Sequence, residues 1–99
     1  MVESFRPGVM ERFGLGPEVM HAINSNIVYV RVSGYGQYNP QSGLSGAAGR
    51  DLNYLAASGL LNQFRRNEKG ATPAFPGNIL TYYGGGSIYA FTLVLQALL

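Results

Sequence analysis

The 99-residue chain carries few charges: 12% of its residues are charged, 46% are hydrophobic, and the net charge is +2. It has no cysteine and a single histidine, His21, which excludes disulfides, thiolate metal sites and multi-histidine metal sites. Its one basic run, residues 65–69, indicates a solvated loop rather than a nucleic-acid-binding face. Soluble domains average about 25% charged residues. The composition therefore favours one partial domain, residues 1–99, covered by other protein chains.

Short strand and helix signals alternate through the first third of the chain. Residues 2–5 can end a strand, Pro7 suits the first turn of a helix, and Gly14 is a natural residue to end it. A second helix begins at Pro17. Residues 27–33, IVYVRVS, are nearly all β-branched, aromatic or apolar, which predicts a parallel strand buried on both faces. Helices followed by such a strand indicate an α/β fold.

A glycine-rich stretch, residues 34–49, follows that strand. Long loops in compact domains are often binding loops, and α/β folds place ligands beyond the carboxyl ends of their strands. A flexible connector is the alternative interpretation. The sequence Gly34-Tyr35-Gly36 is not a dinucleotide-binding fingerprint, because the third glycine of that motif is absent and no helix follows directly.

The only aspartate, Asp51, is expected to cap a helix that runs to about Phe64. The leucines that this helix would turn inward are Leu52, Leu55, Leu60 and Leu61.

A final helix is predicted over residues 79–99, with Asn78 as its cap. The three glycines at 84–86 each cost about 1 kcal/mol in helix propensity. That cost indicates close approach of another backbone or a ligand. The segment is also 21 residues long without a charge, which is transmembrane length. Its glycines, polar residues and tyrosines favour a helix buried in protein over membrane contact.

Four motifs in order resemble the family III CoA-transferases. Residues 5–16, FRPGVMERFGLG, look like the family's FRPGVMERLGLG, and residues 27–37, IVYVRVSGYGQ, are similar to LIYARLSGFGQ. Residues 49–59, GRDLNYLAASG, match GHDINYLALSG, and residues 78–86, NILTYYGGG, fall on NLLADFAGG. The resemblance covers essentially the whole chain, and within the family it is greatest to the α-methylacyl-CoA racemases.

This resemblance implies an α/β fold, as a fragment of the family's Rossmann-like domain. Helices would surround one or a few parallel strands, and a long helix would end the chain. The chain would correspond to an internal segment of its relatives. No cofactor and no metal are implied.

The two positions that carry catalysis in the family are altered here. Racemisation beside a thioester carbonyl requires a base on each face of the α-carbon. The resemblance implies a histidine and an aspartate for these roles, where this chain has Arg50 and Tyr82. Arginine is not deprotonated in proteins, and tyrosine, with a pKa near 10, is a poor base. The family's transferases use the same aspartate as their nucleophile, which a phenol does not replace. No catalytic residue is therefore assigned.

Binding residues are better retained than catalytic ones. Arg6 falls on the family arginine near the CoA phosphates, although a plain surface charge is the alternative. Tyr35 and Tyr54 fall near the family's acyl-CoA channel, which makes all three vestigial CoA-binding candidates. Asp51 matches a family aspartate and is expected to have a capping or structural role. Weak acyl-CoA binding is the most that these residues predict.

Two functions remain open from the sequence. The favoured one is a non-catalytic remnant of an α-methylacyl-CoA racemase that acts as a structural or interaction subunit of a larger assembly. The alternative is an acyl-CoA racemase that epimerises 2-methylacyl-CoA, or a fragment of one completed by other chains. A mitochondrial or peroxisomal location is implied by the resemblance. Secretion is not expected, because residues 1–5 lack the pattern of a signal peptide.

Overall fold

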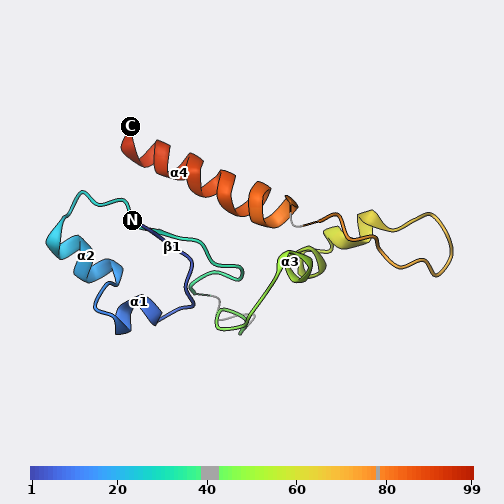
Figure 1. Ribbon diagram of the computed structural model, residues 1–99, viewed down its shortest axis with the longest axis horizontal. Coiled ribbons are helices and arrows are strands. Elements are labelled where there is room, and N and C mark those ends of the chain that lie inside the picture. Colours follow the sequence, from blue (N-terminus) through green and yellow to red (C-terminus); the bar gives the residue numbers. More distant parts are fainter. Residues whose placement is uncertain (39–42, 78) are drawn as a thin grey trace. The chain divides into compact units, whose positions relative to one another are not determined.

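The computed structural model describes residues 1–38, 43–77 and 79–99 (Figure 1). The chain forms two compact units, of which the first comprises residues 1–47 and 90–99 and the second residues 48–89. The predicted cap Asn78 and the middle of the predicted loop 34–49 lie outside the described residues.

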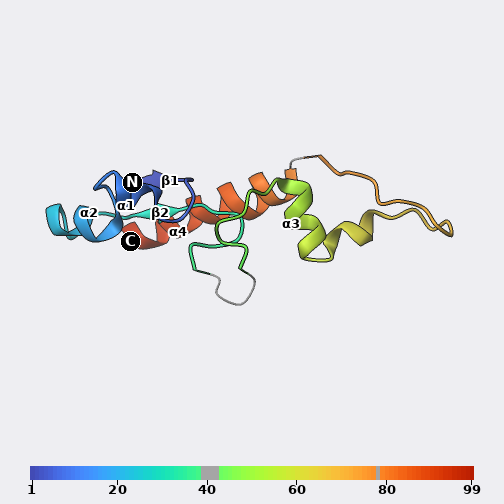
Figure 2. The ribbon, with the colours of Figure 1, turned by 90° about the horizontal axis from the view of Figure 1, so that it is seen from below.

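A small parallel sheet organises the first unit. Strand β1 (Val2–Glu3) pairs with strand β2 (Val30–Arg31), and both strands are labelled in Figure 2. Val2 lies opposite Val30 in the register. Two helices lie between these strands in the sequence, so the connection is a crossover of the kind that parallel strands require. The predicted α/β class and parallel pairing are confirmed.

Strand β2 is shorter than the sequence pattern predicts. Only Val30–Arg31 forms ladder pairs, whereas residues 27–33 were expected to do so. Every residue in that range is half-buried, so the expectation of burial on both faces is wrong. The strand has a single neighbour in the sheet, and its apolar side chains therefore lack the cover that a wider sheet supplies.

The first helix begins two residues later than expected. The Val9 N–H donates to the Arg6 carbonyl at 3.2 Å, and Gly8 has φ +80°. With Pro7 before it, Gly8 completes a type II turn, which requires a positive φ at that position. Helix α1 (Val9–Arg12) starts only after this turn. The prediction that Pro7 occupies the first helical turn is therefore wrong.

The end of α1 is predicted correctly. Gly14 has φ +69°, and its N–H donates to the Glu11 carbonyl at 3.0 Å. The Leu15 N–H reaches the Met10 carbonyl at 2.9 Å. These two bonds satisfy the last carbonyls of the helix in the Schellman pattern. Helix α2 (Pro17–Ile23) then begins at the predicted proline.

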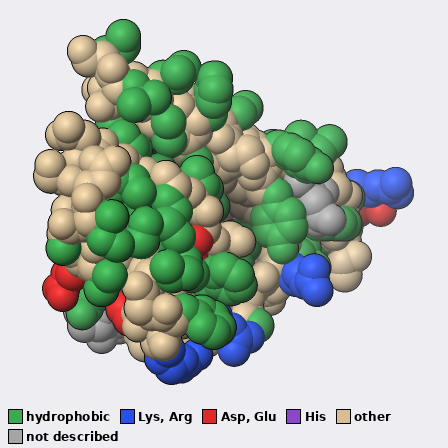
Figure 3. All heavy atoms as spheres, turned by 60° about the vertical axis from the view of Figure 1, so that its left-hand side comes forward, with side chains coloured by type: hydrophobic (Ala, Val, Ile, Leu, Met, Phe, Trp, Pro, Cys, Tyr) green, Lys and Arg blue, Asp and Glu red, His purple; other side chains and the backbone are tan. Residues whose placement is uncertain are grey.

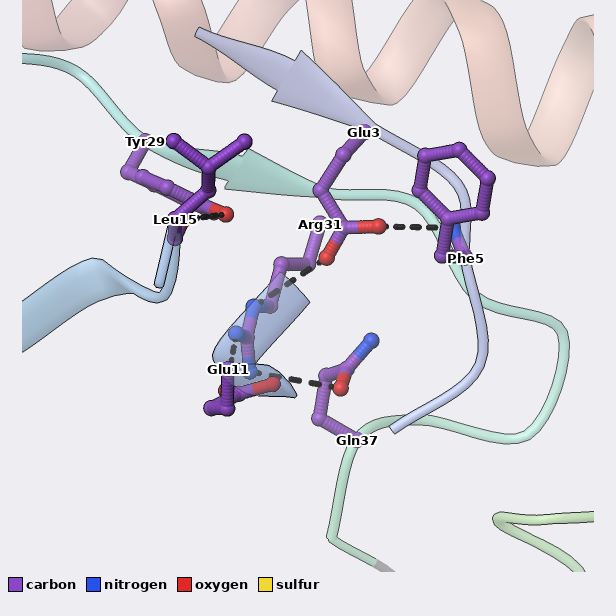
Figure 4. Close-up of polar contacts among 7 residues, drawn as sticks. All are labelled: Glu3, Phe5, Glu11, Leu15, Tyr29, Arg31 and Gln37. Carbon is purple, nitrogen blue, oxygen red and sulfur yellow. Dashed lines mark hydrogen bonds and ion pairs between the residues drawn. The ribbon is translucent and has the colours of Figure 1, made fainter. Parts of the chain in front are cut away.

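A polar network around Arg31 ties α1, the sheet and the start of the following loop together (Figure 4). The Arg31 Nε lies 3.2 Å from a Glu3 Oε1 that is almost fully buried. One terminal nitrogen of the guanidinium bonds Glu11, and the other donates to the Gln37 Oε1 at 3.3 Å. The guanidinium carbon also lies 5.5 Å from the centroid of the Tyr29 ring. Arg31 is thus the hub of the first unit's polar contacts.

Replacing Arg31 by methionine is expected to lower the free energy of unfolding by about 2 kcal/mol, because the buried Glu3 carboxylate loses its counter-charge. The value is below the usual range for buried pairs because the Arg31 side chain is 18% exposed. Chemical denaturation measures the loss. Arg12→Met, an exposed arginine of α1, is the matched control and should change stability little. Equal losses in both variants would show that the network adds nothing specific.

The second unit begins with a helix that is half as long as predicted. Helix α3 (Asp51–Ala57) ends where Gly59 takes φ +77°, and a 3₁₀ helix, η1 (Leu60–Phe64), follows. The Ser58 hydroxyl donates to the Leu55 carbonyl at 3.1 Å, which satisfies one of the helix's last acceptors. A single helix to Phe64 is therefore wrong, because Gly59 ends α3 with a left-handed residue.

The C-terminal helix has the predicted extent but two geometries. A wide π-helical segment, η2 (Ile79–Ser87), leads into the regular helix α4 (Ile88–Leu98). The Ser87 hydroxyl donates to the Tyr82 carbonyl at 3.0 Å, five residues back. In the described part of the chain no helix is long and apolar enough to cross a membrane.

The predicted close approach at the triple glycine is not observed at the two glycines whose surroundings are described. A Cβ added to Gly84 or Gly85 would meet only the segment's own carbonyl oxygens, at 3.6 and 3.7 Å. These are ordinary van der Waals distances. The glycines therefore coincide with the widened π-helical geometry rather than with packing against another backbone. Such π segments are rare and often occur near functional sites.

Very little apolar surface is enclosed. Among the described residues, Met10 and Leu55 are the buried hydrophobic side chains. Leu52 and Leu60, which were expected to point inward, are 43% and 42% exposed. Large exposed hydrophobic side chains lie on α2, η2 and α4, and Figure 3 shows hydrophobic side chains spread widely over one face. A chain of this length normally hides most of such surface.

Candidate functional site

A buried carboxylate joins the two glycine-flanked motifs of the second unit. The Asp51 Oδ2, at the start of α3, accepts the backbone N–H groups of Thr81 and Tyr82, both at 3.0 Å. Asp51 is 0% exposed. We call this arrangement the Asp51 clamp: the carboxylate of Asp51 and the two N–H groups of residues 81 and 82. It fixes the start of η2 against the start of α3, although the two lie 30 residues apart in sequence.

The sequence predicted that Asp51 caps the helix that begins at residue 51. The Asp51 carboxylate instead accepts N–H groups at the start of η2. The cap position of α3 is Arg50, and Asp51 is the first residue inside that helix. The first turn of α3 is closed by Asn53, whose Oδ1 accepts the Arg50 N–H at 2.9 Å. Asp51 is therefore free to satisfy N–H groups of η2, which would otherwise lack partners at a helix start. Sequence spacing alone could not reveal this contact, because it links distant segments.

Two tyrosines pack beside the clamp. The rings of Tyr54 and Tyr82 lie 6.3 Å apart between centroids, at an interplanar angle of 51°. This tilted arrangement is one that aromatic pairs favour. Tyr54 also lies directly on Gly49, where an added Cβ would come within 2.5 Å of its ring. Asp51 and Tyr54 of the first motif thus contact the start of the second, and Gly49 leaves room for the Tyr54 ring.

Burial by itself would raise the pKa of the Asp51 carboxyl group. The nearby Thr81 hydroxyl and the hydrogen bonds from the Tyr82 and Thr81 N–H groups outweigh burial, and the pKa lies below its usual value. The Asp51 carboxylate is therefore ionised at neutral pH and hidden from solvent. A general base has to reach the proton that it removes. A carboxylate hidden in this way is therefore not placed to act as a general base.

Arg50 and Tyr82, which the resemblance predicts to stand at the family's catalytic positions, flank this clamp. Arg50 precedes Asp51 in sequence and is exposed, while the Tyr82 side chain is 36% exposed beside Tyr54. No ion pair in the described part of the chain involves Arg50. A guanidinium and a phenol can bind anions and donate hydrogen bonds. They do not supply the pair of proton acceptors that racemisation requires.

The three CoA-binding candidates are divided between the two units. Arg6 is exposed in the turn before α1, and Tyr35 is half-buried in the loop after β2, both in the first unit. Tyr54 is half-buried in the second unit. Their assignment to CoA remains a prediction. His21 is exposed on α2, in the first unit.

Replacing Gly49 by alanine is expected to destabilise the second unit by about 1–2 kcal/mol, because the new Cβ would overlap the Tyr54 ring. Gly46→Ala is the matched control, since nothing lies within 4 Å of its Cβ position. Thermal unfolding of both variants measures the difference. The double variant with Tyr54→Leu should recover part of the loss. A neutral Gly49→Ala would mean that Tyr54 does not rest on this glycine.

The sequence and the fold both place this chain in a known family. The family model described as CoA-transferase family III matches residues 1–99, and the chain belongs to that family. It is 40% identical to α-methylacyl-CoA racemase of Homo sapiens over 98 residues, which is 99% of this chain and 24% of that protein. The corresponding racemase of Mus musculus is 42% identical over 99 residues, with the same coverage.

The fold is shared with a solved member of the family. A crystal structure of a point variant of Rv3272 from Mycobacterium tuberculosis matches with a TM-score of 0.73 and 29% identity. The match covers 98% of this chain and 26% of that one. The small parallel sheet and the long C-terminal helix are therefore features of the family fold. The chain spans about a quarter of the length of the relatives that it matches.

Proposed function

We propose that this chain is a non-catalytic relative of the α-methylacyl-CoA racemases that acts as an interaction subunit of a larger protein assembly. The observation that carries the proposal is the contrast within the second unit. The Asp51 clamp that holds the two motifs together is intact, whereas Arg50 and Tyr82 occupy the base positions. In this proposal, the contacts that hold the two motifs together are retained, and the two groups that would move protons are absent.

The distribution of apolar side chains supports the interaction role. On α4, one stripe of exposed hydrophobic residues follows the helical repeat, with Phe91 65%, Leu95 47% and Leu98 67% exposed. The helix carries no charged residue. Large apolar surface of this kind marks protein contacts in folded chains.

Light scattering after size-exclusion chromatography tests the interaction role. We expect the isolated chain to self-associate, and the triple variant Phe91→Gln, Leu95→Gln, Leu98→Gln to associate much less. Gln96→Ala, on the same helix, is the matched control and should behave like the parent chain. A parent chain that runs as a stable, monodisperse monomer counts heavily against the proposal. The compartment proposed is mitochondrial or peroxisomal, and imaging of a tagged chain examines it separately.

The alternative is an acyl-CoA racemase, or a fragment of one completed by other chains. The observation that favours it is the retained motif set, since the clamp still brings the two catalytic positions of the family into one unit. This alternative predicts exchange of the α-proton of a 2-methylacyl-CoA. The double variant Arg50→His, Tyr82→Asp restores the two family residues. We nevertheless expect it to show no α-proton exchange as an isolated chain, because the chain spans only about a quarter of the length of its relatives.

A further inference from the structure

The start of η2 has the features of an anion-binding site. Two consecutive N–H groups, those of Thr81 and Tyr82, point at a single oxygen 3.0 Å away. They belong to a continuous helical segment, η2 followed by α4, that runs from Ile79 to Leu98. The first N–H groups of a helix lack partners within the helix and carry partial positive charge, so they favour an anion.

The group that fills this place is the chain's own carboxylate, and it is incompletely satisfied. Asp51 is 0% exposed, and its second oxygen, Oδ1, is buried with no hydrogen-bond partner among the described residues. The Thr81 Oγ1 is likewise buried with no hydrogen-bond partner among the described residues, and the nearby hydroxyl lowers the pKa of Asp51. A hydroxyl hydrogen rotates to suit its acceptor. Rotation of the Thr81 side chain can therefore supply a third donor.

We propose that residues 81 and 82 form a carboxylate-binding site that Asp51 occupies from within. The site's donors are the two N–H groups and the Thr81 hydroxyl, and the ligand class is a small monocarboxylate. The specific consequence is that a free carboxylate of the same size should substitute for the Asp51 side chain. Truncation to alanine removes one carboxylate from a fully buried place and leaves a space of that size.

Chemical rescue of Asp51→Ala with sodium formate tests this proposal. The variant's melting temperature is expected to rise by several degrees as formate increases to about 100 mM, as mass action requires for a ligand of the folded state. Sodium chloride at equal ionic strength should not produce this rise. Glu18→Ala, which removes an exposed carboxylate from α2, should not respond to formate. A bulkier carboxylate such as benzoate should be less effective than formate.

Amide hydrogen exchange locates the effect. The N–H groups of Thr81 and Tyr82 should exchange faster in Asp51→Ala and slow again by several-fold in formate. If the variant does not fold alone, formate should restore its helical circular dichroism. The proposal is overturned if formate changes neither the melting temperature nor helical content beyond chloride. It is also overturned if the two amides of a folded variant do not respond.

Discussion

Replacement of Asp51 by alanine is expected to lower the melting temperature by roughly 5–10 °C, the largest effect of any polar substitution in the second unit. The reason is that one fully buried oxygen accepts two N–H groups of a part-buried helix start, at 3.0 Å each. Both groups lose their acceptor when the carboxylate is removed. Glu18→Ala removes a carboxylate from the first turn of α2 without a comparable contact and should shift the temperature far less.

The same carboxylate should make stability depend on acid. Because the pKa of Asp51 is lowered by the fold, its contribution is fully present above the pKa of the unfolded chain, near pH 4. It is lost as the pH falls through the lower, folded value. The pKa of Glu11 is also lowered, chiefly by its hydrogen bond from Arg31. Asp51→Asn and Glu11→Gln should therefore each flatten the acid limb of a stability-against-pH curve. An unchanged limb in Asp51→Asn would contradict the clamp.

Replacement of Leu55 by alanine is expected to cost about 3 kcal/mol, which is enough to unfold the second unit of so small a chain. Leu55 is 0% exposed, and in the described part of the chain Met10 is the one other buried hydrophobic residue. A core this thin has few neighbours that could close the cavity. Leu52→Ala is the matched control on the same helix, because Leu52 is 43% exposed. Chemical denaturation should separate the two variants clearly, and equal losses would contradict this description of the core.

The order of the helices and strands, and several of their starts and ends, were predictable because they depend on local signals. The proline at 17 starts α2, Gly14 ends α1, and residues 79–98 are helical, as expected. Lengths were less predictable. Strand β2 is short because only one neighbouring strand pairs with it. The helix expected to reach Phe64 ends early because Gly59 takes a left-handed conformation. The leucines on both sides of Gly59 follow a helical pattern, so the sequence does not show this break.

The site was only partly predictable, for a similar reason. The sequence marked the two motifs and the replacements at Arg50 and Tyr82. It could not show that the Asp51 carboxylate accepts a hydrogen bond from the Tyr82 N–H, 31 residues further along the chain. Nor could it predict π-helical geometry at the triple glycine, where a tight contact was expected. Both features arise from long-range hydrogen bonding or backbone register rather than from residue type.

We propose that the family's site scaffold remains here without its proton-moving groups. The decisive experiment is exchange of the α-proton of a 2-methylacyl-CoA in deuterated water, followed by mass spectrometry. We expect no deuterium incorporation above the uncatalysed background at any protein concentration. Incorporation that scales with protein concentration and disappears in Tyr82→Phe would overturn the proposal, because it would show that the Tyr82 phenol still moves a proton.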